Sequence, residues 1–454
     1  MRYDLIIRGG SVVTPAGVSA ADIGIEDHRI VEIGPALSGA ARVELDAHGL
    51  TVFPGVIDPH VHFNEPGRTD WEGFETGSTA LAAGGGTCFF DMPLNSSPPT
   101  LDRASFDAKR AAGERSSITD FALWGGLTPQ NLDHLEELAD CGVIGFKAFM
   151  SGSGIDDFGR ADDLTLLRGM EIAARLNLPV AVHAESEELT SRLTDEARRN
   201  GRRGVRDYLA TRPIVAEVDA IRRAILFAQE TGCSLHIVHI SSAAGSIEVV
   251  EGKHLYRKDG SGAVDVTGET CPHYLFLSDD DVARLGSSAK CAPPLRNKEE
   301  VEALWMQVLS GGIDFIGSDH SPAPASLKAS EDFFDIWGGI AGVQSTLSLL
   351  LSQTRGLSAV RIAELTSTNA ARRFGIPGKG TIAVGHDADL ALVDMNASYT
   401  LLREHLLDRH KLSPYVGRQL RGQVRHTLVR GQQVIRDGAP VGNFRGKFIA
   451  RPRA

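Results

Sequence analysis

The chain has 454 residues, of which 42% are hydrophobic and 23% are charged, and its formal net charge is −11. This length suffices for one large domain and a smaller one, and the proportions are ordinary for a soluble globular protein. The excess of acidic over basic residues is spread along the chain. It argues against nucleic acid or an anionic membrane as the main partner.

Cysteine content and hydropathy predict a reduced, cytoplasmic setting. The chain has an odd number of cysteines without CxxC spacing, which favours free thiols over a disulfide framework. The N-terminal residues contain no apolar core of signal-peptide length. No run of about 18 apolar residues predicts a membrane span. We therefore expect a soluble cytoplasmic protein.

Short alternating runs at both ends of the chain predict β-strands. Near the start, Leu5–Arg8 and Arg29–Gly34 lie between glycine and proline turns. The same pattern returns near the end, for example at Val424–Gly431. We expect residues 1–52 and 376–454 to build one small β-sandwich domain together.

The middle of the chain, residues 53–375, alternates short apolar runs with helical stretches. One predicted helix begins after Asp162, and another covers Ala216–Gln229 and ends at Gly232. The predicted strands are Val52–Ile57, Thr87–Asp91, Phe121–Gly125, Ile144–Phe149, Val180–His183, Leu235–Ile240, Val264–Glu269 and Ile313–Gly317. Eight strand–helix units predict an α/β fold, a (β/α)8 TIM barrel. A doubly wound open sheet is the alternative, which the lack of a Gly-x-Gly-x-x-Gly fingerprint disfavours.

The first of these strands leads into the motif Asp58-Pro59-His60-Val61-His62. Residues i and i+2 of a strand point to the same face, so His60 and His62 can direct two imidazoles at one metal ion. A His-x-His pair alone is weak evidence, because most such pairs are surface or hydrogen-bonded histidines. The other strand ends must supply further ligands.

Polar side chains also occur at the ends of later strands, where a barrel places its active site. They are Lys147, His183, His239 and Asp319. Each has an ordinary interpretation: core histidines, a helix cap for Asp319, and a snorkelling or ion-paired side chain for Lys147. Their placement at the same barrel end favours a metal site instead.

Lys147 is the unusual member of this group, because it lies between Phe146 and Phe149 on a central strand. A charged ammonium is costly in such surroundings. A desolvated neutral lysine can add carbon dioxide and become a carbamate. Because a carbamate is anionic and has two oxygens, an N6-carboxylysine at this position can bridge two cations.

Together these features resemble the cyclic amidohydrolases, a family that includes dihydroorotases, hydantoinases and allantoinases. The resemblance rests on Asp-x-His-x-His at 58–62, Gly-Phe-Lys at 145–147, single histidines on two strands, and Ser-Asp-His at 318–320. It covers nearly the whole chain, including the split β domain. It implies a homo-oligomer, either a dimer or a tetramer.

The resemblance also implies a binuclear metal centre with zinc as the first choice and manganese, cobalt or iron as alternatives. In the implied mechanism, a hydroxide that bridges the metals attacks the ring carbonyl. Asp319 takes the proton from it and delivers it to the leaving ring nitrogen. The implied ligands are His60, His62 and Asp319 for one ion and His183 and His239 for the other, with Lys147, carboxylated by CO2, bridging them.

Several longer strings resemble allantoinases, which open the hydantoin ring of allantoin to give allantoate in purine degradation. They are Phe63–Gly73, Asp91–Thr100, Lys290–Arg296, Trp337–Gly342 and Ser413–Gly417. Ala323 is a departure, because allantoinases often have cysteine there. Dihydroorotases carry an arginine two residues after the second histidine, where this chain has Asn64, which suits a neutral ring.

A hydantoinase, dihydropyrimidinase or dihydroorotase with the same chemistry is the alternative function. A catalytically inactive scaffold is disfavoured, because all six implied ligands are present. Arg68 is expected to pair with a loop acid, Asp70 or Glu72, and His273 is expected to lie behind the ligands. By analogy with hydantoinases, the predicted substrate contacts are Asn64, Ser153, Ala292 and Gly339.

Overall fold

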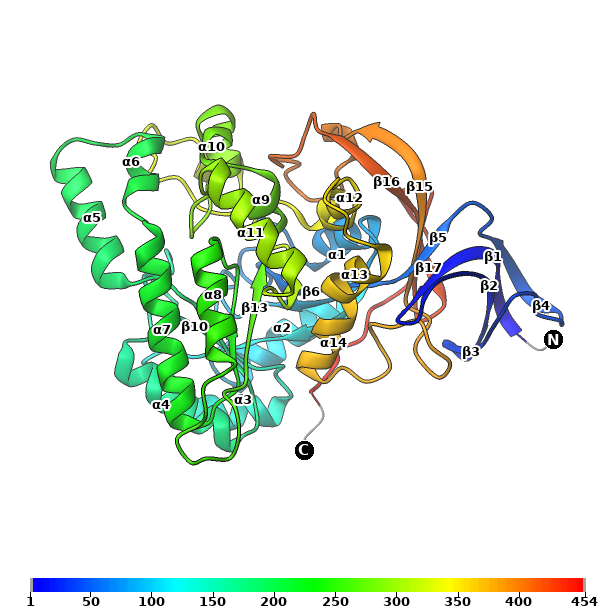
Figure 1. Cartoon of the computed structure of the whole chain (residues 1–454), viewed down its shortest axis with the longest axis horizontal. Coiled ribbons are helices and arrows are strands. Elements are labelled where there is room, and N and C mark those ends of the chain that lie inside the picture. The colour runs from blue at the N-terminus through cyan, green and yellow to red at the C-terminus, as the bar shows by residue number, and fades with distance from the viewer. Residues whose placement is uncertain (1–2, 452–454) are drawn as a thin grey trace.

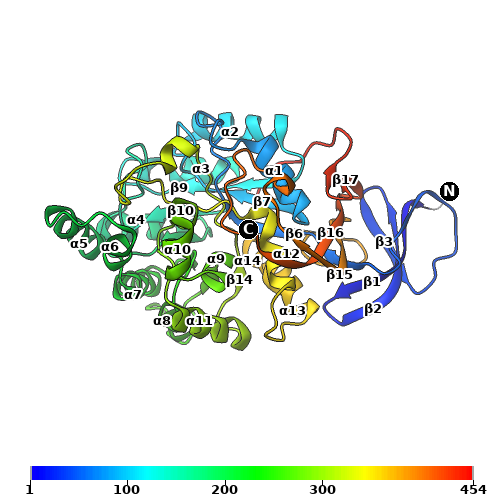
Figure 2. The ribbon, with the colours of Figure 1, turned by 90° about the horizontal axis from the view of Figure 1, so that it is seen from above.

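The computed structural model describes residues 3–451, which form a helix-covered barrel and a curved sheet beside it (Figure 1). Seen from above, the helices surround the barrel, and β1 to β3 lie at the far side of the sheet (Figure 2). No helix within residues 3–451 combines the length and apolar character that crossing a bilayer requires. The five cysteines, all within this range, are free thiols.

The barrel strands are parallel throughout and follow the predicted order. They are β6 (Val56–Val61), β7 (Gly86–Asp91), β8 (Asp120–Leu123), β9 (Gly125–Gly126), β10 (Phe146–Phe149), β11 (Val180–His183), β12 (Leu235–Ile237), β13 (Val266–Thr270) and β14 (Phe315–Ile316). The barrel closes where Val61 of β6 pairs in parallel with His320, and the His62 amide donates to the His320 carbonyl at 2.8 Å. This closure confirms the barrel and rules out the open sheet.

The predicted first strand, Val52–Ile57, is wrong in its extent. Its first half is β5 (Thr51–Pro54), which belongs to the outer sheet, and β6 starts only after Gly55. A side chain at Gly55 would approach Thr87 Oγ1 to 2.2 Å, so the chain can pass this point only with glycine. Consequently His60 lies inside β6 rather than beyond its end.

The helices cover the outside of the barrel. In α4 the Asp162 side chain accepts from the Thr165 amide at 2.8 Å, and α7 ends at Gly232 with φ 71°, which confirms both predicted helices. The helices are α1 (Phe74–Ala83), α2 (Arg103–Ser116), α3 (Leu135–Cys141), α4 (Asp163–Arg175), α5 (Glu187–Arg199), α6 (Val205–Ala210), α7 (Ile214–Thr231), α8 (Ala243–Gly252), α9 (Pro272–Phe276), α10 (Asp279–Leu285), α11 (Lys298–Ser310), α12 (Thr346–Leu351), α13 (Ala359–Ala363) and α14 (Asn369–Phe374).

The two ends of the chain meet in one nine-stranded sheet, with the order β18-β17-β16-β15-β5-β1-β2-β3 and β4 paired to β1. Its strands are β1 (Tyr3–Thr14), β2 (Gly17–Glu26), β3 (Arg29–Gly34), β4 (Ala41–Asp46), β5, β15 (Leu390–Thr400), β16 (Gln419–Val429), β17 (Gln432–Arg436) and β18 (Ala439–Pro440). Residues from both ends, such as Ile23 and Leu390, share one apolar core. This confirms a TIM barrel with a small β domain made by both termini.

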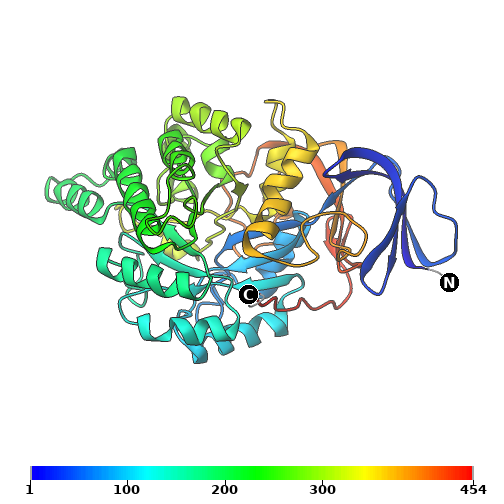
Figure 3. The same cartoon turned by 60° about the horizontal axis from the view of Figure 1, so that its bottom comes forward.

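A buried ionic group, which we call the junction cluster, ties the sheet to the floor of the barrel. It consists of Asp120 at the start of β8, Lys379, Asp389 and Arg430. Lys379 Nζ lies 2.8 Å from Asp120 Oδ2 and 2.5 Å from Asp389 Oδ2, while Arg430 Nε lies 3.1 Å from Asp120 Oδ2. The C-terminal segment runs back beneath the barrel to the same place, where the Lys447 amide donates to Asp120 (Figure 3).

Candidate metal centre

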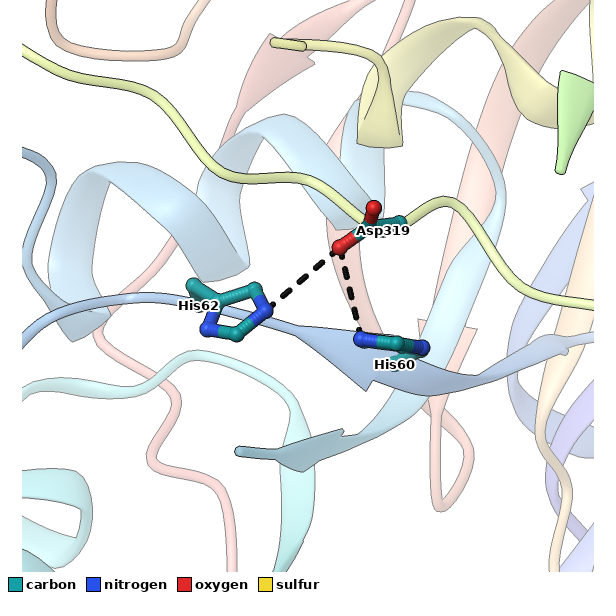
Figure 4. Close-up of side chains that lie close together, drawn as sticks. All are labelled: His60, His62 and Asp319. Atoms are coloured by element: carbon teal, nitrogen blue, oxygen red, sulfur yellow. Dashed lines mark ion pairs between the residues drawn. The ribbon is translucent and has the colours of Figure 1, made fainter. Parts of the chain in front are cut away.

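Three of the predicted ligands converge at the carboxyl end of β6. His60 Nε2 and His62 Nε2 lie 3.3 and 3.4 Å from the same oxygen, Oδ1 of Asp319 (Figure 4). One potential ligand atom from each residue lies within 4.8 Å of the other two. Burial would raise the pKa of Asp319, but the surrounding histidines hold it well below its usual range. Two imidazoles and one carboxylate therefore face one point.

Asp58 explains why these residues meet. Its Oδ1 accepts from the Ser318 amide at 3.0 Å and from the His60 amide at 3.2 Å, so it joins the first strand to the segment after the last. Asp319 then adopts φ 46°, a left-handed conformation that residues other than glycine rarely adopt. Such backbone conformations gather at functional sites, where the surrounding structure enforces them.

Polar neighbours orient both histidines of β6. His60 Nδ1 lies 2.5 Å from Oε1 of Glu269 on β13, whose other oxygen lies 3.3 Å from His236 Nε2. Although burial opposes it, the two histidines lower the pKa of Glu269 to about 2. The side-chain amide of Asn95 lies 3.2 Å from His62 Nδ1. In both rings Nδ1 faces the protein and Nε2 faces Asp319, which is the usual arrangement behind metal-binding histidines.

The second predicted pair, His183 and His239, is also in contact. His183 Nδ1 lies 3.0 Å from His239 Nε2, and the rings of His60 and His239 lie 5.4 Å apart, so the pair adjoins the first group. Phe149 stacks on His183 with ring centroids 4.6 Å apart. Oε2 of Glu185 lies 2.9 Å from His183 Nε2, and Glu185 is itself paired with Arg212.

Lys147 on β10 is fully buried, and its Nζ has no hydrogen-bond partner among the described residues. The nitrogen lies 4.6 Å from the centroid of Phe149. Burial lowers the pKa of this amine to about 7, against the attraction of Glu269 and Asp319. The amine thus has the environment that the carbamate prediction requires.

The donor atoms fit a binuclear centre. Imidazole nitrogens and a carboxylate oxygen are suitable ligands for zinc and related divalent ions. The described structure leaves two buried polar atoms of this group without a partner, Lys147 Nζ and His239 Nδ1. Buried polar atoms are seldom left so, and an unpaired one in a native protein calls for an explanation such as an ion. The residues expected to hold two ions are therefore brought together.

Five of the predicted ligands line a small cavity of about 70 Å³: His60, His62, His183, His239 and Asp319. The lining includes three of the four predicted substrate contacts, Ser153, Ala292 and Gly339. It also includes Asn95, Trp337 and Phe149, so it combines polar groups with apolar walls. Apolar walls with a few converging polar groups are typical of a small-molecule site.

The fourth predicted contact, Asn64, does not line this cavity. It is fully buried, has φ 64°, and its Nδ2 donates to the Pro322 carbonyl at 3.4 Å. The expected partners of Arg68 are also wrong. Arg68 pairs with Asp157 at 3.0 Å and donates to the Asn95 carbonyl at 3.0 Å, because the intervening loops fold toward it.

His273 lies close to Asp319 and does not line the cavity, and its expected place behind the ligands stays a prediction. It is fully buried, and a ligand atom of His273 lies within 4.8 Å of possible ligand atoms of Cys271 and Asp319. Both of its ring nitrogens lack hydrogen-bond partners among the described residues. Burial lowers the pKa of His273 to about 4, so the ring is neutral near pH 7.

Sequence reasoning missed three residues that touch the predicted ligands: Glu185, Glu269 and Asn95. Glu185 and Asn95 stand shortly after strands β11 and β7, and Glu269 is the fourth residue of β13. The rule that polar residues at barrel strand ends form the site would have found Glu269, because it ends a predicted strand. Asn95 has φ 70°, which an asparagine in a turn tolerates better than most residues.

Comparisons with known proteins agree with this geometry. Residues 51–434 match the model of the amidohydrolase family. The chain is 58% identical to an allantoinase of Solibacter usitatus, over 99% of this chain and 97% of that protein. It is 54% identical to an allantoinase of Deinococcus radiodurans over the full length of both.

Solved structures give the same result for the fold. The L-hydantoinase (dihydropyrimidinase) from Arthrobacter aurescens superposes with a TM-score of 0.94 at 32% identity, over 99% of this chain and 100% of that chain. A D-hydantoinase structure gives 0.90 at 30% identity, over 99% of each chain. The barrel, the added sheet and the full-length similarity lead to one conclusion: this chain belongs to the amidohydrolase family.

Proposed function

We propose that this protein hydrolyses the hydantoin ring of allantoin to give allantoate. The observation that carries the proposal is the convergence of His60, His62, His183, His239 and Asp319 on one small cavity in a chain that is similar to allantoinases along its whole length. The reaction adds water across a ring C–N bond, so the enzyme is a hydrolase of cyclic amides.

The family's binuclear centre supports a site for two divalent ions in this protein, with zinc as our first choice. We assign His60, His62 and Asp319 to one ion and His183 and His239 to the other. Lys147, carboxylated by CO2, is the proposed bridge. When bound, the two ions supply Lewis acidity, which activates water and polarises the ring carbonyl.

The chain's own residues perform the remaining steps. Asp319 lines the cavity and accepts the proton that water loses as its oxygen forms a bond to the ring carbon. The same carboxyl then returns the proton to the ring nitrogen as the C–N bond breaks, so the proton count balances. Ser153, Ala292 and Gly339 remain our proposed substrate contacts, and Asn95 joins them because it lines the cavity.

The structural similarity to hydantoinases makes a hydantoinase activity the second candidate. A dihydroorotase is disfavoured, because no Arg or Lys occurs among the described residues that line the cavity to pair with a substrate carboxylate. The predicted division into a barrel, 53–375, and a small domain, 1–52 with 376–454, stays our proposal, with its first boundary moved to Gly55 because β5 belongs to the outer sheet. A homodimer or homotetramer and a cytoplasmic location stay predictions.

The decisive experiment compares initial rates on allantoin, hydantoin, dihydrouracil and dihydroorotate with the zinc-loaded protein. We expect kcat/KM for allantoin to exceed the others by at least about tenfold, because differential transition-state binding sets such preferences. Asp319→Asn should abolish turnover while the far-ultraviolet circular dichroism stays unchanged. Turnover of hydantoin without turnover of allantoin would replace the proposal by the second candidate.

A further inference from the structure

One wall of the cavity consists of Trp337, Gly338 and Gly339, so two of its three residues present only backbone. This wall, residues 337–339, follows a loop that begins with a short 3-10 turn, Ala325–Lys328. A side chain at Gly339 would approach the Ser321 carbonyl oxygen to 2.2 Å, so the wall lies against the segment that carries Asp319. Its position therefore fixes the width of the site.

Lys328 reaches this wall from the start of the loop. Its Nζ donates to the carbonyl oxygens of Trp337 at 2.9 Å and of Gly339 at 2.6 Å. A third hydrogen bond, at 3.2 Å, goes to the Ser287 carbonyl after α10. The ammonium thus joins both ends of the wall to a neighbouring element.

Lys290 holds the same loop from the other side. Its Nζ donates to three carbonyls of the loop, those of Phe333, Phe334 and Ile336. Its own carbonyl accepts from the Gly339 amide at 2.8 Å. The nitrogen also lies 4.6 Å from the centroid of Tyr208, whose hydroxyl donates to the Cys291 carbonyl.

The two ammonium groups are used in an unusual way. An ammonium has three N–H donors, and here all six bind backbone carbonyls. No carboxylate oxygen of the described residues lies within 4.0 Å of either nitrogen. Burial lowers the pKa of both side chains to about 7, whereas the carbonyls favour the protonated form that donates three bonds. Apolar side chains at positions 290 and 328 would avoid the cost of burying two ammonium groups. The hydrogen bonds to the carbonyls therefore need a reason other than filling space.

We propose that Lys290 and Lys328 are positioning residues that hold residues 337–339 as a preformed wall against which the cyclic amide binds. This inference rests on the proposed function for the identity of the substrate. The wall carries Trp337, whose indole N–H is buried and has no partner among the described residues. A rigid wall keeps that donor and the backbone of Gly339 at fixed distances from Asp319.

The test uses Lys290→Met and Lys328→Met in the full-length, zinc-loaded protein, with Lys298→Met as a control. Lys298 is exposed, does not line the cavity, and pairs with Asp280 at 3.1 Å. We expect kcat/KM for allantoin to fall about 100-fold in the first two variants, because small displacements in an active site have effects of this size. Zinc content should stay at the wild-type value in all three.

Two further measurements separate positioning from general destabilisation. Hydrogen exchange of the intact protein should accelerate in residues 325–340 and stay unchanged in the barrel strands. Propylammonium added to Lys328→Ala should restore part of the activity, since Lys328 is only partly buried and a small amine can replace its head group. Wild-type exchange together with wild-type kcat/KM in both methionine variants would overturn the inference. If the wild-type protein turned over no cyclic amide, the proposed function would fail, and the exchange data would still decide whether the lysines hold the wall.

Discussion

Glu269 offers the sharpest test of how the metal centre is built. It is fully buried, it lies 2.5 Å from His60 Nδ1, and it does not line the cavity. Glu269→Gln keeps the size and one acceptor oxygen but removes the negative charge. We therefore expect His60 to remain in place and to become a weaker ligand, because the carboxylate behind it no longer raises its basicity.

The magnitude follows from this geometry. Loss of the partner behind a metal-binding histidine typically lowers metal affinity by about 10- to 100-fold. At about 1.4 kcal/mol for each factor of ten, the change corresponds to about 1.4–2.8 kcal/mol of binding free energy.

The assay is a competition for zinc between the protein and a chromophoric chelator, followed at fixed pH. Glu302→Gln is the control. Glu302 lies on α11, is exposed, pairs with Arg355 and does not line the cavity. The control should release zinc at the same chelator concentration as the wild-type protein. Glu269→Gln should release it at a chelator concentration that is lower by a factor of at least about ten. Identical release curves for all three proteins would refute the reasoning.

Two other predictions concern the junction cluster and the cavity. Lys379→Met should lower the free energy of unfolding by about 3–5 kcal/mol in urea denaturation, because it leaves the buried Asp389 carboxylate without its cation, while Asp120 keeps Arg430. Arg110→Ala, which removes an exposed pair with Glu114, should cost no more than about 0.5 kcal/mol, and equal losses would contradict the buried-cluster argument. Asn95→Ala should raise KM for allantoin roughly tenfold, the effect of losing one hydrogen bond in a buried site. Unchanged steady-state kinetics would remove Asn95 from the substrate contacts.

The sequence predicted the barrel and the convergence of the ligands because both follow from local patterns. Each ligand stands at or near the end of an apolar run, and parallel barrel strands bring such ends together whatever the intervening loops do. The change of sheet at Gly55 was not visible, since the apolar run from Val52 to Ile57 continues through it. The strand pairings show the change, because β5 pairs with β1 and β15 whereas β6 pairs with β7.

Loop side chains were harder to place than strand ends. The spacing after His62 predicted a substrate contact at Asn64. In the structure Asn64 has a positive φ, and its side chain donates to the Pro322 carbonyl and does not line the cavity. The pairing of Arg68 with Asp157 joins loops from two different strand–helix units. Contacts of that kind depend on the folded surface and leave no periodic signal in the sequence.

The junction cluster has a consequence for protein engineering. The barrel of this chain is not a detachable module, although its strands close on themselves. An excised fragment ending near residue 375 would keep Asp120 beneath the barrel and lose Lys379, Arg430 and the Lys447 amide, which are its partners. Burying that carboxylate alone would cost several kcal/mol. Grafts of this catalytic barrel therefore need the C-terminal strands, or a neutral residue at position 120, to fold.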